Sequence, residues 1–236
     1  MKQAKIILLR HGQCEGGSIL RGKTDVSLSD LGFCNMHQSA AKLGLLGYLP
    51  FLNIYSSPLI RCRVFADELS QQLNQVDCSL TLKPKLMSEL QEIDFGLWDG
   101  KGFDELYQHH AAELDAYWDN PWDNALPEAE LMADFERRVA SAFELITEQL
   151  YDATELDDLS ELGEQGEQSN QPCAALVVTH GGVMRHIISL VLGVTRCKAL
   201  YAQFNLDYAA TVSIDVFWSE TDDKHNKPVY RLNWSS

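Results

Sequence analysis

The stretch AKIILLRHG, residues 4–12, decides the fold of this chain. Ala4 to Leu9 is a short run that is apolar except for Lys5 and ends abruptly at Arg10. Such a run is typical of a strand buried on both faces, as in a parallel sheet. The stretch AALVVTHGG, residues 174–182, has the same plan, and Leu52 to Tyr55 is a weaker third run. The chain therefore predicts a sheet whose central strands are fully buried.

Helical patterns separate these apolar runs. Ser29 is a candidate N-cap for a helix to about Leu45, and Ser57-Pro58 predicts a helix to about Leu73 with Pro58 at its first position. Gly181-Gly182 can open another helix through Leu192. Apolar residues three or four apart predict a further helix, at Leu131, Phe135, Val139, Phe143, Ile146 and Leu150. Strands that alternate with helices predict an α/β fold with a mainly parallel sheet.

Three other segments have patterns of their own. Thr211 to Phe217 alternates in polarity and predicts a hairpin with Val229 to Leu232 across a polar turn at 220–227. Residues 97–127 are rich in Trp, Tyr, Asp and Asn and predict an insertion over the sheet edge. Residues 152–171 contain seven acidic residues and no basic one, which predicts a charged, mobile loop.

Two histidines follow the two strongest strand patterns. His11 and His180 each precede a glycine, which lets the backbone turn tightly beside a ligand. Ligands of open α/β sheets lie outside the carboxyl ends of the strands, near helix N-termini with free N–H groups. A single histidine at a strand end is more often structural. Two in matched contexts, with Arg10 beside one of them, favour a binding or catalytic site.

Arg61 is a candidate partner for these histidines. It lies in the first turn of a predicted helix, where the helix dipole disfavours a cation. A bound anion would explain this position, and the alternative is a surface arginine next to Arg63. Arg10 and Arg61 would suit phosphoryl oxygens, because a guanidinium group can bind them with two parallel hydrogen bonds.

Cleavage of a phosphate ester also needs a general acid, because an alkoxide is a poor leaving group. The stretch SELQEIDFG, residues 88–96, offers Glu89, Glu92 and Asp94. Residue type does not separate these three carboxylates, and a solvated acidic turn is the alternative for at least two of them.

Composition limits the classes of partner. The 236 residues include 19 Lys and Arg and 34 Asp and Glu, which gives a formal net charge of −15. This balance argues against a duplex nucleic-acid binder and against a polybasic membrane-surface protein. The short N-terminal apolar run does not fit a signal peptide, and the six cysteines form no CxxC pair. We therefore expect a cytoplasmic protein with reduced thiols, acting on a small molecule.

Five stretches together resemble the histidine phosphatase superfamily, whose fold is called phosphoglycerate-mutase-like. LLRHG at 8–12 resembles the family signature. The other four occur in the family's order: RGKTDVSLSDLG (21–32), SSPLIRCRVFADEL (56–69), LQEIDFGLWDG (90–100) and VVTHGGVMRHII (177–188). The resemblance implies a three-layer sandwich, with a mainly parallel central sheet flanked by helices. It also implies a single domain over residues 1–236, with 97–127 as a small inserted cap.

The resemblance also implies roles for individual residues. His11 corresponds to the nucleophile that becomes phosphohistidine, and Glu92 corresponds to the proton donor. Arg10, Arg61 and His180 correspond to the residues that hold the phosphoryl oxygens. Because arginine and histidine supply the positive charge, the resemblance implies a phosphoric monoester hydrolase that needs neither a metal ion nor another cofactor.

Within the family, the chain looks most like the α-ribazole phosphatases of cobalamin biosynthesis, which act on α-ribazole 5′-phosphate. The grounds are its size, its EIDFGLWDG stretch and the lack of long insertions. Aromatic residues of the insertion could stack on a benzimidazole ring or pack the insertion onto the sheet: Trp98, Phe103, Tyr107, Trp118 and Trp122. The alternatives are a broad-specificity or sugar-phosphate phosphatase, a phosphoglycerate mutase, and a non-catalytic phosphate-binding regulatory module.

The chain departs from the family pattern at two positions near the expected site. Cys14 stands where the family often has Thr, and Gly17 stands where it often has Asn. The hydroxyl and amide groups of those residues help to bind phosphate or substrate in the family. We therefore expect the contacts around the phosphate to differ here.

Overall fold

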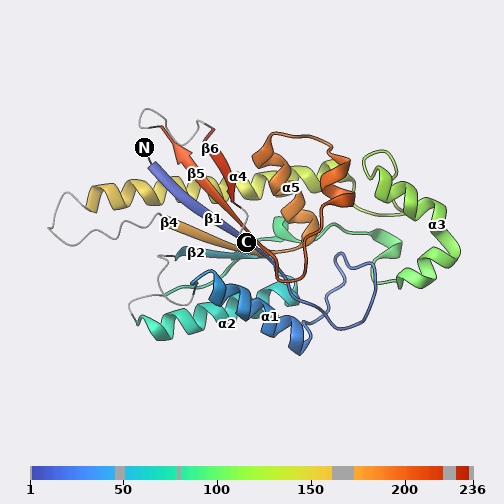
Figure 1. Cartoon of the computed structure of the whole chain (residues 1–236), viewed down its shortest axis with the longest axis horizontal. Coiled ribbons are helices and arrows are strands. Elements are labelled where there is room, and N and C mark those ends of the chain that lie inside the picture. Colours follow the sequence, from blue (N-terminus) through green and yellow to red (C-terminus); the bar gives the residue numbers. More distant parts are fainter. Residues whose placement is uncertain (1, 46–50, 79–80, 161–172, 220–226, 234–236) are drawn as a thin grey trace.

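A computed structural model describes residues 2–45, 51–78, 81–160, 173–219 and 227–233. Its centre is a six-stranded sheet in the order β3-β2-β4-β1-β5-β6 (Figure 1). The four strands β3, β2, β4 and β1 are parallel to one another. Strand β5 is antiparallel to β1, and β6 is antiparallel to β5. The strand bounds are Lys2–Arg10 for β1, Phe51–Ser56 for β2, Lys85–Leu86 for β3, Cys173–Thr179 for β4, Thr211–Trp218 for β5 and Val229–Asn233 for β6. The predicted mainly parallel sheet and C-terminal hairpin are confirmed, while residues 220–226 of the predicted turn lie outside the described residues.

Helices cover both faces of this sheet. The helices α1 (Asp30–Lys42) and α2 (Ile60–Val76) lie on one face, and α4 (Met132–Ser160) and α5 (Gly181–Leu192) lie on the other (Figure 1). Successive side chains of a strand point to opposite faces. Accordingly, Ile6 and Leu8 of β1 belong to the core under α4 and α5. Ile7 and Leu9 belong to the core under α1 and α2. The three-layer α/β sandwich is therefore confirmed.

The starts of the first two helices differ in how well the sequence predicted them. Ser29 caps α1 as expected, and its Oγ accepts a hydrogen bond from Gly32 N at 3.1 Å. Helix α2 begins at Ile60, so the prediction that Pro58 occupies the first helical position is wrong. The reason is local, because Ser57 Oγ accepts a hydrogen bond from Leu59 N at 3.3 Å and the helix starts only after this turn.

Helix α4 is longer than the composition suggested. It continues to Ser160, so the predicted loop over 152–171 is wrong for residues 152–160, and residues 161–172 lie outside the described residues. Packing explains the difference. The Tyr151 ring lies 5.5 Å from the ring of Trp218, Thr154 is buried, and Glu155 pairs with Lys2 at the start of β1. These contacts outweigh the local density of acidic residues.

The segment 97–127 lies beyond the carboxyl ends of β1 and β4 (Figure 1). It contains helix α3 (Phe103–Asp119), which is kinked at His110, and a bridge between Ile19 and Gly102 ties it to the loop after β1. This position brings the segment over the end of the sheet where His11 and His180 lie. In the part of the chain that the structure describes, no helix combines the length and apolar character that a bilayer crossing requires.

Candidate active site

The two predicted histidines meet at the end of the sheet. Strands β1 and β4 pair in parallel with Arg10 opposite Thr179, so His11 and His180 emerge side by side. Their ring centroids are 5.2 Å apart at an interplanar angle of 60°. Both side chains are buried. The matched sequence contexts thus predicted a real juxtaposition.

Hydrogen bonding determines which nitrogen of His11 is free. His11 Nδ1 lies 2.8 Å from the carbonyl oxygen of Gly12, to which it can only donate. In the neutral ring, Nε2 then carries the lone pair. Burial lowers the pKa of His11 well below its ordinary value, and the nearby charges of Arg61, Arg10 and Arg21 lower it further. The ring is therefore neutral near pH 7 and has a nucleophilic nitrogen.

Arg61 fixes the orientation of the His180 ring through a hydrogen bond. Its Nε donates a hydrogen bond to His180 Nδ1 at 3.3 Å, so in the neutral ring Nε2 carries the proton and donates to Ser57 Oγ at 2.8 Å. The other Arg61 nitrogens donate to the carbonyl oxygens of Thr24 and Gly22 at 2.9 and 2.6 Å. Burial and the charge of Arg61 lower the pKa of His180 well below its ordinary value.

Arg10 completes the cationic side of the site. It donates a hydrogen bond to the carbonyl oxygen of Leu206, and its guanidinium carbon lies 4.6 Å from the centre of the Tyr208 ring. Its Nε is buried and has no hydrogen-bond partner among the described residues. Within the same described ranges, neither Arg10 nor the fully buried Arg61 forms an ion pair. Two such guanidinium groups without a carboxylate partner would suit an anion, although only Arg10 lines the cavity described below.

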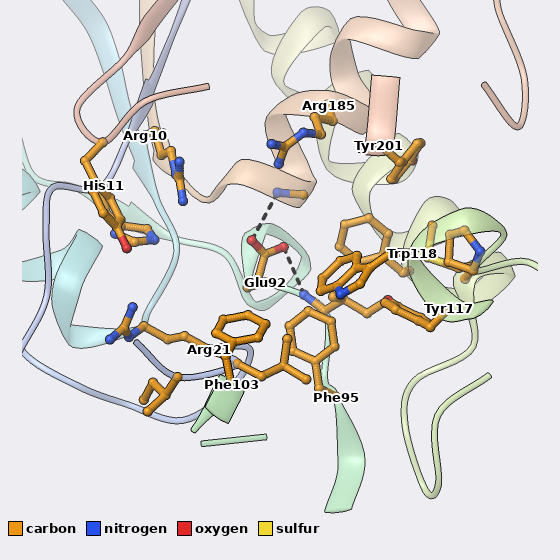
Figure 2. A pocket seen from close by; sticks show the side chains of 18 residues that line it. Arg10, His11, Arg21, Glu92, Phe95, Phe103, Tyr117, Trp118, Arg185 and Tyr201 are labelled. Atoms are coloured by element: carbon orange, nitrogen blue, oxygen red, sulfur yellow. Dashed lines mark hydrogen bonds between the residues drawn. The ribbon is translucent and has the colours of Figure 1, made fainter. Parts of the chain in front are cut away.

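The structure separates the three candidate acids. Glu92 is held by two backbone N–H groups, since Ile93 N donates to Oε1 at 3.1 Å and Gly182 N to Oε2 at 3.0 Å (Figure 2). Its carboxylate lines the same cavity as Arg10 and His11. Asp94 instead pairs with Lys23 at 2.5 Å, and neither Asp94 nor Glu89 lines the cavity. Glu92 is therefore the carboxylate that faces the histidines.

The cavity between these groups has two ends of different chemistry. It has a volume of about 230 Å³ and is polar where Arg10, His11, Arg21, Glu92 and Arg185 meet. The other end is apolar and largely aromatic (Figure 2), lined by Phe95, Phe103, Tyr117, Trp118, Met132 and Phe135. This arrangement suits a ligand with an anionic group and a bulky apolar group.

The aromatic residues proposed for stacking fall into two groups. Phe103 and Trp118 line the cavity, so they are placed to touch a ligand. Trp98 is buried in the core against His110, and Trp122 donates its N–H to Glu136 at 2.9 Å outside the cavity lining. Tyr107 is exposed and does not line the cavity either.

Comparison with known proteins explains this arrangement. The model of the histidine phosphatase superfamily (branch 1) matches residues 6–222. The chain belongs to this superfamily. A curated relative of this histidine phosphatase, from Hydrogenobacter thermophilus, is named "Putative phosphoserine phosphatase 2". It is 27% identical over 197 residues, which cover 80% of this chain and 79% of the relative.

Solved structures of similar fold include other phosphatases. A mycobacterial glucosyl-3-phosphoglycerate phosphatase superposes with a TM-score of 0.74 at 22% identity, over 99% of each chain. The α-ribazole phosphatase from Shigella flexneri superposes with a TM-score of 0.64 at 21% identity, over 98% of this chain and 96% of that one. At these identities the likeness concerns the fold.

Sequence reasoning missed three arginines of this histidine phosphatase. Arg21 and Arg185 line the cavity. Arg138 supports the Glu92 loop from outside, donating to the carboxylate of Glu130 at 2.6 and 2.8 Å and to the carbonyl oxygens of Glu89, Gln91 and Glu92 at 2.7, 2.7 and 3.1 Å. Arg21 and Arg185 lie inside stretches that resemble the family, but nothing in their local pattern indicated a role.

The two departures from the family pattern are Cys14, which lies beside His11, and Gly17. Cys14 Sγ is 3.5 Å from His11 Nδ1, and burial raises the pKa of its thiol. Gly17 has a φ of 70°, and its carbonyl oxygen accepts a hydrogen bond from Arg21 Nη2 at 2.9 Å. Arg21 thus brings a cation to the region where Cys14 and Gly17 lack the family's usual polar groups.

Proposed function

We propose that this histidine phosphatase is a phosphomonoesterase that works through a phosphohistidine at His11. The observation that carries the proposal is the hydrogen bond of His11 Nδ1 to Gly12 O at 2.8 Å, which leaves the lone pair on Nε2, a nitrogen without a hydrogen-bond partner among the described residues. An adjacent cavity with cations and one carboxylate gives the phosphoryl group and the leaving group their places. Phosphoryl transfer depends mainly on such positioning and on electrostatic stabilisation.

In the first step, His11 Nε2 attacks phosphorus in line with the ester oxygen. The N–P bond forms as the P–O bond to the leaving group breaks. Protonated Glu92 gives its proton to the departing oxygen, so the alcohol leaves neutral. Arg10 and Arg61 stabilise the negative charge on the transferred phosphoryl group, and the Nε2–H group of His180 moves from Ser57 Oγ to a phosphoryl oxygen.

In the second step, water attacks the phosphohistidine. Glu92, now a carboxylate, accepts a proton from the water as the new P–O bond forms and the N–P bond breaks. Inorganic phosphate leaves and His11 is neutral again. Since the arginine and histidine side chains carry the charge stabilisation, we propose that the cycle needs no metal ion. In the described residues, no three His, Cys, Asp or Glu side chains are grouped to hold one.

The substrate that we propose is α-ribazole 5′-phosphate. The aromatic end of the cavity, with Phe103 and Trp118, supports a planar apolar group several bonds from the phosphate. The resemblance of the EIDFGLWDG stretch and the fold shared with an α-ribazole phosphatase agree with this choice. A polar leaving group such as serine would leave the apolar end unfilled.

A phosphate-release screen tests the proposal. The panel contains α-ribazole 5′-phosphate, phosphoserine, glucosyl-3-phosphoglycerate, ribose 5-phosphate and nucleoside monophosphates, each with wild type and with His11→Ala. We expect α-ribazole 5′-phosphate to have the highest kcat/KM and His11→Ala to be inactive. A higher kcat/KM for a sugar phosphate would show that the enzyme prefers a sugar phosphate to α-ribazole 5′-phosphate. Isomerase activity that depends on a bisphosphate primer would indicate a mutase, and no release from any ester would indicate a phosphate-binding module.

A further inference from the structure

Arg185 lines the cavity, and the proposed mechanism does not use it. It is the fifth residue of α5 and is held in place by one acceptor, the carbonyl oxygen of Phe204. Nε and Nη2 donate to this oxygen at 3.1 and 3.0 Å. Nη1 has no hydrogen-bond partner, and Arg185 forms no ion pair, among the residues described. The side chain is therefore fixed while one nitrogen stays free.

The free nitrogen lies close to Arg10 at the polar end of the cavity. A Cβ built on Gly181 would lie 2.9 Å from Arg185 Nη1 and 3.3 Å from Arg10 Nε, so both nitrogens lie near the same place beside Gly181. Glu92 lies beside them, bound to the backbone of Gly182 (Figure 2). Arg185 thus borders the place where the leaving group separates from the phosphoryl group.

We propose that Arg185 is a leaving-group-binding residue, whose Nη1 donates a hydrogen bond to a neutral ether or hydroxyl oxygen close to the ester oxygen. This inference rests on the proposed phosphomonoesterase activity and adds a requirement on the substrate. The preferred ester carries an oxygen acceptor between its phosphate and its apolar group. The acceptor lies next to Glu92, so Arg185 and the acid act on the same part of the substrate.

The surroundings of Arg185 explain why the acceptor is neutral. Nε and Nη2 each use one N–H group on the Phe204 carbonyl oxygen, so three N–H groups, two on Nη1 and one on Nη2, remain for a ligand. A carboxylate on the leaving group would come close to the carboxylate that Glu92 becomes as soon as it has given up its proton, and like charges repel. A neutral ether or hydroxyl oxygen avoids this repulsion.

A matched pair of substrates tests this inference. 2-Phenoxyethyl phosphate and 3-phenylpropyl phosphate have the same chain length and an alkyl leaving group, and differ by one oxygen in place of a CH₂. A hydrogen bond to a charged group is worth about 1.5–3 kcal/mol, which corresponds to a preference of about 10- to 160-fold in kcat/KM for the phenoxyethyl ester. We expect this preference in wild type.

Three variants identify the source of the preference. Arg185→Met should reduce it to less than about threefold, while the rate on the phenylpropyl ester stays within about threefold of wild type. Arg185→Lys, which retains a cationic donor, should keep part of it. Arg137→Gln is the control, because Arg137 is exposed on α4 and pairs only with Asp134 among the described residues. Thermal unfolding verifies that each variant is folded.

The outcomes separate the inference from the proposed function. An equal loss on both esters in Arg185→Met, or weaker inhibition by inorganic phosphate, would place Arg185 in the phosphoryl site and overturn the inference. The absence of any preference in wild type would overturn it without a variant. If wild type hydrolyses neither ester and forms no phosphohistidine, the proposed function itself fails and the role of Arg185 fails with it.

Discussion

Replacing Glu92 with Gln should slow the enzyme in a way that depends on the leaving group. The change removes the acidic proton and keeps the size of the side chain. General acid catalysis contributes about 10²- to 10⁴-fold, so kcat for an alkyl ester should fall by that factor. 4-Nitrophenolate leaves without protonation, so the loss on 4-nitrophenyl phosphate should stay below about tenfold.

The structure also predicts a cost in stability for Glu92→Gln. The carboxylate accepts hydrogen bonds from both Ile93 N and Gly182 N. A Gln amide can accept from only one of them and turns its own NH₂ toward the other. One N–H group then loses its partner, and the free energy of unfolding should fall by about 1–3 kcal/mol. Urea unfolding measures this separately from the kinetic effect.

A second variant, Gly182→Ala, should shift the Glu92 carboxylate without changing its chemistry. A Cβ on Gly182 would overlap Glu92 Oε1, so Gly182→Ala should displace the carboxylate and produce the same leaving-group pattern. Glu89→Gln is the matched control, because Glu89 lies outside the cavity lining and should keep wild-type rates. Equal slowing of alkyl and nitrophenyl esters by Glu92→Gln would refute the assignment of Glu92 as the acid.

Three further predictions concern the cationic end of the site. Brief mixing with ³²P-labelled substrate and acid-free quenching should label wild type but not His11→Ala, and label on any other residue would contradict the proposed nucleophile. Inorganic phosphate at about 100 times its Kd should stabilise the fold by about 2.7 kcal/mol, and Arg21→Gln should require more phosphate for the same rise in Tm. Because the folded-state pKa of His180 is lowered, the unfolded chain binds more protons than the folded one below about pH 6.5. The free energy of unfolding should therefore decrease as the pH is lowered below this value, by up to about 1.4 kcal/mol per pH unit. His180→Gln should flatten this dependence in urea unfolding at pH 5 to 7, and an unchanged slope would contradict it.

Much of the fold could be predicted because its signals are local. Ile6 to Leu9 of β1 and Cys173 to Val178 of β4 are uninterrupted apolar runs, which are distinctive of strands covered on both faces. Arg61 was also visible locally, because a cation in the first turn of a helix conflicts with the dipole. Its burial next to His180 agrees with a site rather than with a surface position.

The remaining features depend on contacts between distant parts of the chain. Glu89, Glu92 and Asp94 are chemically alike within one short stretch, and only the approach of Gly182 and the cavity distinguish Glu92. Arg185 has its role because Phe204 holds its guanidinium, which no helical pattern records. The helical continuation to Ser160 likewise depends on packing against β5 and an ion pair with β1.

The central place of β1 has a consequence for biosynthesis. This strand leaves the ribosome before both of its neighbours in the sheet, which are β4, beginning at Cys173, and β5, beginning at Thr211. Strand β1, with His11 after its end, therefore has no partner strand until β4 and β5 have been translated. Pairing of strands so distant in sequence is slow and exposes apolar surface in the meantime. The nascent chain should consequently need chaperone protection, and no phosphatase activity should appear before translation passes β5.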